Sequence, residues 1–157
     1  MIDQKDYGKL SELVSALTDT SLPLVSNLSN VSAVLGGMES VNWAGFYIAE
    51  DGVLYLGPFQ GKPACTKIPF GRGVCGTAAE SQKTVIVDDV DSFPGHIRCS
   101  AESRSEIVVP IVKEGRTVAV IDIDSPEYAR FGREDAEELE KIAGGLAGLF
   151  GPENACY

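Results

Sequence analysis

The sequence predicts an α+β fold in which two N-terminal helices and one C-terminal helix pack on a central antiparallel sheet. Apolar residues recur at three- and four-residue steps over the first 35 residues, which is the period of an amphipathic helix. The middle of the chain contains short apolar segments joined by turns, which is typical of strands in hairpins. The closing segment begins with acidic residues, which favours a helix start. This order of elements indicates one α+β domain over residues 1–157.

Two amphipathic helices are expected first, and Gly36-Gly37 should end the second of them. Their apolar positions are Tyr7, Leu10, Leu13, Val14 and Leu17 in the first helix, and Leu24, Val25, Leu28, Val31, Val34 and Leu35 in the second. A meander of three strands should follow, and the Asp51-Gly52 turn joins the first two. These strands are expected over residues 42–50, 53–59 and 63–69.

The second half of the chain is expected to continue with a Gly-rich turn and a short helix near Cys75. A long loop after the next strand is a candidate functional segment, because long loops without secondary structure are uncommon in compact domains. A second hairpin around Lys113 to Gly115 and a closing helix should complete the domain. The expected ranges are a helix over 75–81, a strand over 84–87, the loop over 88–104, strands over 106–112 and 116–124, and a helix over 133–150.

Composition excludes several classes of function. The net charge is −10 with no cluster of Lys or Arg, so the chain should repel nucleic acid. The chain has no run of 18 apolar residues and no basic stretch followed by an apolar run at its start. We therefore expect neither export nor membrane insertion, and a cytoplasmic location.

Acidic residues end the strand expected over 116–124. Alternation places Val118, Val120, Asp122 and Asp124 on one face, and Thr117, Ala119, Ile121 and Ile123 on the other. Because both faces are mostly apolar, the strand should be central and covered on both sides. Two carboxylates there would not both ionise easily and would share a proton. Glu106 opens the neighbouring strand and is a third candidate acid, and the alternative is that these acids lie in solvent at the strand end.

Aromatic residues form a second group on the first expected strand. Trp43, Gly45 and Tyr47 share one face, so the missing side chain at Gly45 predicts a gap between two rings. A methyl or thioether group would suit such a gap, because sulfur contacts aromatic rings favourably. The alternative is that both rings are ordinary core residues.

Three of the four cysteines lie in the central part of the chain, and in a reducing compartment thiols clustered this way suggest packing, metal binding or nucleophilic chemistry rather than structural disulfides. Cys75 should begin a helix, and Cys99 follows His96 and Arg98 and precedes Arg104; each setting lowers the pKa of a thiol. Cys65 lies on an apolar strand and is more typical of a packed residue. Both Cys75 and Cys99 are therefore candidate nucleophiles.

A zinc site from Cys65, Cys75, His96 and Cys99 is the alternative use of these residues. Its cysteine spacing is much wider than that of a zinc knuckle, which disfavours it. A Gly-x-Gly-x-x-Gly match at Gly71, Gly73 and Gly76 lies among antiparallel hairpins rather than in a βαβ unit, so a dinucleotide site is not expected.

Several segments together resemble the free methionine-(R)-sulfoxide reductases, a family of GAF domains. These segments are NWAGFYI, LYLGPFQGKPAC, IPFGRGVCGTAAES, VDDVDSFPGHIRC, SRSEIVVPI and IDIDSPEYARF, which span nearly the whole chain. The resemblance implies a GAF fold, a homodimer and reduction of the free amino acid rather than of sulfoxide in proteins.

The resemblance also implies residue roles. Cys99 matches the cysteine that attacks the sulfoxide sulfur and becomes a sulfenic acid, and Cys65 the one that resolves it as a disulfide. Cys75 matches the remaining family cysteine, with the catalytic or resolving role as its alternatives. The other matching residues are Trp43 and Tyr47, around the methyl sulfoxide, and Glu106, Asp122 and Asp124, which hold the ammonium and activate the sulfoxide. Cys156 lies outside the pattern.

This chemistry needs a proton donor for the leaving oxygen, and a carboxyl group with a raised pKa suits that task. Thioredoxin or a similar reductant would return the disulfide to a dithiol, and neither a metal nor an organic cofactor is required. Two other functions fit the same features: a non-catalytic GAF sensor of a small molecule or of redox state, and a zinc-stabilised structural module.

Overall fold

The computed structural model describes residues 7–96 and 101–151. Helices α1 (Tyr7–Leu17) and α2 (Leu24–Gly36) come first, as the apolar spacing predicted. The remaining helices and strands follow in the order β1 (Trp43–Glu50), β2 (Val53–Gln60), β3 (Lys67–Pro69), α3 (Gly73–Ser81), β4 (Val85–Val87), β5 (Ser105–Lys113), β6 (Arg116–Ser125) and α4 (Arg133–Leu146). Short 3₁₀ turns lie at Val90–Ser92 and Ala147–Leu149, and the second of these shortens the closing helix expected to reach residue 150.

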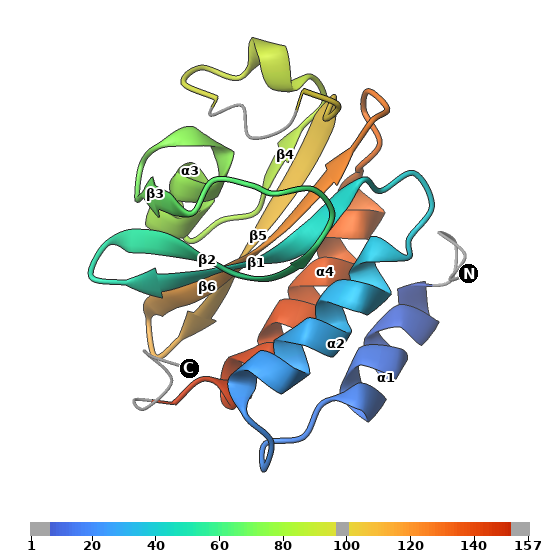
Figure 1. Ribbon diagram of the computed structural model, residues 1–157, viewed down its shortest axis with the longest axis vertical. Coiled ribbons are helices and arrows are strands. Elements are labelled where there is room, and N and C mark those ends of the chain that lie inside the picture. Colours follow the sequence, from blue (N-terminus) through green and yellow to red (C-terminus); the bar gives the residue numbers. More distant parts are fainter. Residues whose placement is uncertain (1–6, 97–100, 152–157) are drawn as a thin grey trace.

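The strands form one twisted antiparallel sheet of six strands in the order β3-β2-β1-β6-β5-β4 (Figure 1). Helices α1, α2 and α4 cover one face of the sheet, and α3 lies on the other (Figure 1). The prediction of an α+β fold with a central antiparallel sheet is therefore confirmed. Strands β1, β6 and β5 lie inside the sheet, so side chains on either of their faces are covered.

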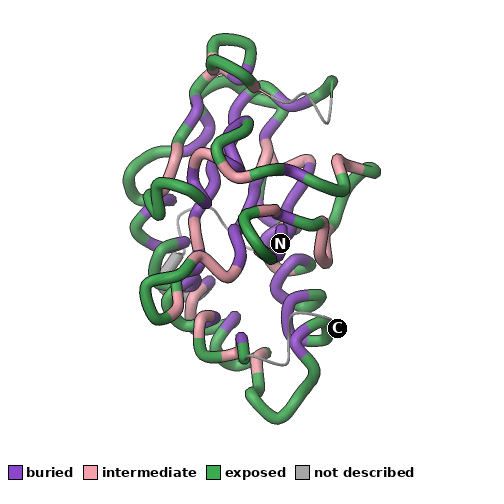
Figure 2. Tube along the Cα trace, turned by 90° about the vertical axis from the view of Figure 1, so that its left-hand side faces the viewer, coloured by how far each residue is buried: buried purple, intermediate pink, exposed green. Residues whose placement is uncertain are grey.

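Apolar side chains form two clusters, one on each face of the sheet. The larger cluster joins α1, α2 and α4 to the sheet through fully buried residues such as Leu28, Phe46 and Leu139. The smaller cluster, between α3 and the opposite face, contains Trp43, Tyr47, Cys75 and Val120. Figure 2 shows that buried positions follow the strands and the inner sides of the helices, whereas the turns are exposed.

The strand expected over residues 63–69 is only three residues long, Lys67–Pro69. The segment before it leaves the sheet, and two aromatic side chains bind its carbonyl groups. Trp43 Nε1 donates to the Lys62 carbonyl at 3.0 Å, and the Tyr47 hydroxyl donates to the Cys65 carbonyl at 2.9 Å. Since side chains satisfy these backbone acceptors, no strand pairing is needed there.

The alternation expected along β6 holds from Ala119 onward and is wrong before it. The pairing changes from Ile111↔Ala119 to Val112↔Thr117, so Val118 is the extra residue of a β-bulge. Val118 therefore packs against the cluster on the helical face. Thr117 instead turns toward α3, and its hydroxyl donates to the Ala79 carbonyl at 2.7 Å.

Candidate active site

Strand register brings the predicted acids and aromatic residues onto one face of the sheet. Trp43 on β1 pairs with Asp124 on β6, which in turn pairs with Glu106 on β5. In the next row Asp122 lies between Gly45 and Val108. Residues directly opposite each other on antiparallel strands point to the same side. The three acids therefore share the α3 face of the sheet with Trp43 and Tyr47.

Burial decides between the two alternatives for the acids. Glu106 and Asp122 are each only 6% exposed, and Asp124 is partly buried. The acids thus do not lie in solvent at the strand end. Asp122 Oδ1 is buried and accepts no hydrogen bond from the described residues, which is costly for a carboxylate oxygen unless a ligand or water occupies the site.

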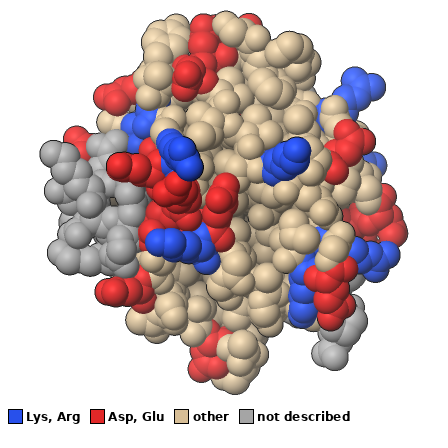
Figure 3. All heavy atoms as spheres, turned by 180° about the vertical axis from the view of Figure 1, so that it is seen from behind, with Lys and Arg blue, Asp and Glu red and all other residues tan. Residues whose placement is uncertain are grey.

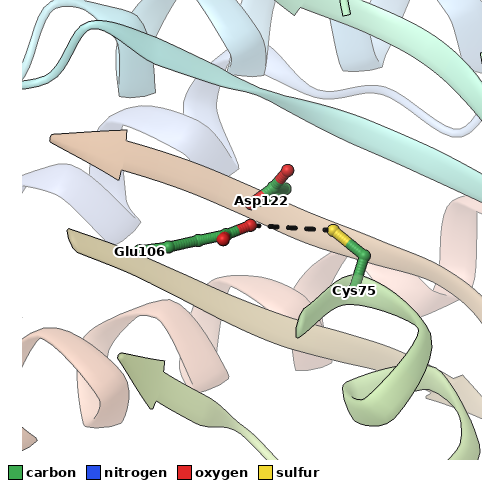
Figure 4. A group of neighbouring side chains, drawn as sticks. All are labelled: Cys75, Glu106 and Asp122. Carbon is green, nitrogen blue, oxygen red and sulfur yellow. Dashed lines mark hydrogen bonds between the residues drawn. The ribbon is translucent and has the colours of Figure 1, made fainter. Parts of the chain in front are cut away.

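Helix α3 places the Cys75 thiol directly above these acids. Cys75 Sγ lies 3.9 Å from Glu106 Oε1, and a ligating atom from each of Cys75, Glu106 and Asp122 lies within 4.8 Å of the others (Figure 4). The glycines beside Cys75 permit this approach. A Cβ on Gly76 would stand 2.5 Å from the Pro69 carbonyl oxygen, so a larger residue there would push α3 away from the sheet.

Crowding in this dry cluster raises the pKa of each acidic group. Burial, followed by the charge of Asp124, raises the pKa of Glu106 to about 8. Burial, followed by the charge of Glu106, raises the pKa of Asp122 well above its usual value. The pKa of Asp124 is also raised, first by burial and then by Asp122, although a hydrogen bond from Ser103 opposes this. At least one carboxyl group in the cluster therefore holds a proton near neutral pH.

The lowered pKa expected for Cys75 from its place at a helix start is wrong. Cys75 is the third residue of α3 and is buried, and burial followed by the charges of Asp122 and Glu106 raises the pKa of its thiol well above the usual value. Partial positive charge at the helix end is outweighed because the thiol faces carboxyl groups in a dry environment. Cys75 is thus a hydrogen-bond donor to Glu106 rather than a ready thiolate.

Cys65 lies at the edge of the same region and forms a disulfide bond, whereas Cys75 is free. The partner of Cys65 is not among the described residues. Cys99 and Cys156 both lie outside them. A disulfide also removes the Cys65 sulfur from the zinc site that the sequence offers as an alternative. Within the described residues, the metal-ligating atoms that lie together are those of Cys75, Glu106 and Asp122.

The gap expected at Gly45 is filled by protein. A Cβ at Gly45 would lie 2.4 Å from Phe59 Cβ and 2.8 Å from the Pro58 carbonyl oxygen, so this glycine permits close approach of β2. The Phe59 ring stacks on Trp43 at 5.2 Å, and Trp43 stacks on Tyr47 at 6.0 Å. The aromatic residues thus form a packed wall without a slot between them.

Gly45→Ala is therefore expected to destabilise the fold by about 1–3 kcal/mol, since the new methyl group overlaps Phe59 and the β2 backbone. Gly144→Ala is the control, because Gly144 is an exposed position in α4 with open space around its Cβ. That change should stabilise the chain by about 0.5–1 kcal/mol. Denaturant unfolding measures both values, and equal stability of the two variants would contradict the packing at Gly45.

Together these side chains enclose a narrow cavity. Its empty space is about 540 Å³ including the open mouth. Its lining joins Trp43, Tyr47, Pro63, Ala64, Ile68, Arg72, Gly73, Val74, Cys75, His96, Ser103, Glu106, Asp122 and Asp124. The cavity has an aromatic wall, an acidic floor and a side formed by the first turn of α3.

Three polar residues of the cavity are not among the predicted site residues. Ser103 hydrogen-bonds Asp124, and Arg72 is the N-cap residue of α3. His96 was considered only as a neighbour of Cys99 and as a zinc ligand, but its Nε2 lies 3.6 Å from Glu106 Oε2. Long-range folding creates these contacts, so no local pattern could have found Ser103, whereas the Gly-rich turn ahead of α3 was a signal for Arg72.

No helix within 7–96 and 101–151 has both the length and the hydropathy of a membrane-spanning segment. On the face shown in Figure 3, acidic side chains lie in several separate groups, some with Lys or Arg beside them, and no continuous basic surface is present there. This distribution agrees with the net charge of −10 and gives no footprint for a polyanion on that face.

Comparison with known proteins identifies the family. Residues 15–150 match the family model described as GAF domain. Free methionine-R-sulfoxide reductase of Saccharomyces cerevisiae is 50% identical over 136 residues, covering 81% of this chain and 76% of the yeast protein. The enzyme of the same name from Escherichia coli is 45% identical, covering 89% of this chain and 86% of its own.

Comparison with solved structures gives the same family. The X-ray structure of free methionine-R-sulfoxide reductase from Neisseria meningitidis in complex with its substrate superposes with a TM-score of 0.83 at 44% identity, covering 92% of this chain and 85% of that one. The chain belongs to the free methionine-R-sulfoxide reductase family of GAF domains. The resemblance seen in the sequence is thereby confirmed, as are the GAF fold and the assignment to the oxidoreductases.

Proposed function

We propose that the chain reduces free L-methionine-(R)-sulfoxide to methionine by thiol chemistry. The observation that carries this proposal is one cavity with an aromatic wall and three carboxyl groups, beside which the Tyr47 hydroxyl binds the carbonyl of the disulfide-bonded Cys65. Each part suits one part of the substrate, which has an apolar methyl sulfoxide end and a zwitterionic end.

At the zwitterionic end, the acidic floor would hold the ammonium group and the first turn of α3 the carboxylate. Arg72, Gly73 and Val74 line the cavity, and Arg72 makes no side-chain cap on the helix. An uncapped helix start and a guanidinium group both attract carboxylates. Methionine within a peptide has neither charged group beside its α-carbon, so the buried acids would remain unpaired and the free amino acid would be preferred.

At the sulfoxide end, Trp43 and Tyr47 would contact the methyl and sulfur atoms, a contact of about 0.3–1.5 kcal/mol. The Cys99 thiolate would attack the sulfoxide sulfur, and a carboxyl group of Glu106 or Asp122 would protonate the departing oxygen. A second proton lets the oxygen leave as water, which breaks the S–O bond and leaves Cys99 joined to the substrate as a sulfonium. Water then attacks the Cys99 sulfur and breaks the S–S bond, which releases methionine and a proton and leaves Cys99 as the sulfenic acid. In this scheme Asp124 holds the ammonium.

The Cys65 thiol would then attack the sulfenic sulfur, expelling water and forming the Cys65–Cys99 disulfide. This assignment agrees with the disulfide-bonded state of Cys65, because Cys99 and Cys156 are the cysteines outside the described residues. A dithiol reductant of the thioredoxin type would supply two electrons and two protons to restore both thiols. We also propose that the chain is a homodimer, for which light scattering would give twice the mass of one chain.

The decisive experiment supplies the purified protein with the separated R and S epimers of free methionine sulfoxide. The R epimer alone should be consumed, both with a thioredoxin system and with dithiothreitol, whereas N-acetylmethionine sulfoxide should remain. The dithiothreitol arm separates a wrong reductant from a wrong reaction. Failure to consume either epimer in both arms would refute the proposal and favour a sensor that binds without turnover.

A further inference from the structure

Three side chains that meet in the cavity carry donor atoms suited to a metal ion. Cys75, Glu106 and Asp122 come from α3, β5 and β6, and their ligating atoms lie within 4.8 Å of one another (Figure 4). Tetrahedral zinc with one sulfur and one oxygen ligand places the two ligands roughly 3.6 Å apart. The Cys75 Sγ to Glu106 Oε1 distance is 3.9 Å, so small side-chain movements would complete the coordination.

One carboxyl oxygen of Asp122 has no hydrogen-bond partner among the described residues. Asp122 Oδ1 is buried in a residue that is 6% exposed, and none of the described residues donates a hydrogen bond to it. Exposed acidic clusters obtain their partners from water, whereas Asp122 lines a narrow cavity together with Cys75 and Glu106. A cation bound between these three side chains would give the buried carboxylate a partner.

The types of ligand atom also indicate which metal ion this site would bind. Two carboxylates with a thiolate favour a borderline-soft divalent metal such as Zn²⁺, whereas Mg²⁺ and Ca²⁺ prefer oxygen ligands alone. His96 Nε2 lies 3.6 Å from the other Glu106 oxygen, which is the position of an outer partner that orients a ligating carboxylate.

We propose that Zn²⁺ binds in the cavity through Cys75 Sγ, Glu106 and Asp122, and that it inhibits the chain by excluding the sulfoxide group of the substrate. The second half of this proposal rests on the proposed function, because Glu106 and Asp122 would face the sulfoxide oxygen there. Binding of the metal and binding of the substrate would therefore be mutually exclusive.

Metal binding is tested on the oxidised full-length chain carrying Cys156→Ser, so that Cys75 provides the thiol under study. Cadmium replaces zinc as the probe, because cadmium thiolates absorb in the ultraviolet. We expect one equivalent of Cd²⁺ to produce the thiolate band, and Zn²⁺ but not Mg²⁺ to displace it. Cys75→Ser should abolish the band. Asp122→Asn should weaken Cd²⁺ binding at least about tenfold, which is the smallest effect expected when even a residue that only supports a metal ligand is lost.

Asp51→Asn is the matched control for Asp122→Asn, since it makes the same chemical change at an exposed turn. It should leave Cd²⁺ affinity unchanged. Circular dichroism verifies that each variant is folded. A band of full size in folded Cys75→Ser, or displacement by Mg²⁺ as effective as by Zn²⁺, would overturn the metal site.

Inhibition is tested separately with the reduced enzyme. Zn²⁺ should raise KM for the R epimer without changing kcat, and the sulfoxide should weaken Cd²⁺ binding to the oxidised chain. A lowered kcat with unchanged KM would overturn the exclusion of substrate. Turnover without a cadmium band would refute the metal site alone, and a cadmium band without turnover would refute the proposed function alone.

Discussion

Cys99→Ser is expected to lower kcat by at least about a thousandfold, the scale on which loss of a nucleophile acts, whereas Cys75→Ser should retain kcat within about tenfold. Cys75 is buried against Glu106 and Asp122, which keep its thiol protonated, and a protonated thiol is a poor nucleophile. Steady-state kinetics with the R epimer measures both variants. Cys156→Ser is the control and should match the unchanged chain, because Cys156 lies outside the family pattern.

A second measurement identifies the attacked cysteine directly. In Cys65→Ser, the reaction should stop after one turnover with a sulfenic acid on Cys99, which a dimedone label and mass spectrometry would locate. Label on Cys75, together with loss of turnover in Cys75→Ser and its survival in Cys99→Ser, would reverse the two roles.

Glu106→Gln and Asp122→Asn are each expected to lower kcat/KM by about 10²–10⁴, the range attributed to general acid catalysis. Each change removes an acidic proton but keeps the size of the side chain, so the packing around β5 and β6 should persist. Asp124→Asn should also cost activity, chiefly through KM, because Asp124 is proposed to hold the ammonium. Asp51→Asn, exposed and remote in the β1–β2 turn, provides the matched control.

Stability must be measured beside these rates. Since burial disfavours the charged form of both carboxyl groups, neutral amides of the same shape should not destabilise the fold, and thermal midpoints should stay near that of the unchanged chain. Near-normal kinetics in both Glu106→Gln and Asp122→Asn would exclude them as the proton donor.

Local spacing was sufficient to predict most of the helices and strands. Leu10, Val14, Leu28 and Val31 recur at helical steps because one helix face must be buried, and that requirement is visible within a few residues. The Asp51-Gly52 turn likewise specified the β1–β2 hairpin. The predictions are wrong where contacts with distant segments decide the structure. Val118 lies in a β-bulge, which reverses the face expected for it. Cys65 lies outside the expected strand, because its carbonyl accepts a hydrogen bond from the Tyr47 hydroxyl rather than from a neighbouring strand.

The site likewise contains residues that local spacing predicts and contacts that only the tertiary structure shows. Alternation along β1 and β6 was enough to place Trp43, Tyr47, Asp122 and Asp124 on their faces. It did not reveal that Phe59 closes the gap at Gly45, since that contact depends on how closely β2 approaches. Nor did it reveal that Ser103 hydrogen-bonds Asp124, because Ser103 lies in the loop before β5 and meets Asp124 only when β5 pairs with β6.

By itself, the sequence determined the α+β class, the family and the residue types of the site, because these depend on periodicity and on motifs within short segments. Only the tertiary structure decided the state of those residues. Packing α3 on the sheet removes water from Cys75, Glu106 and Asp122 and brings them together. Loss of solvent and mutual repulsion then raise the pKa of each group, so Cys75 is a thiol rather than the thiolate expected at a helix start, and the raised pKa expected for the acids at the strand end includes that of Glu106.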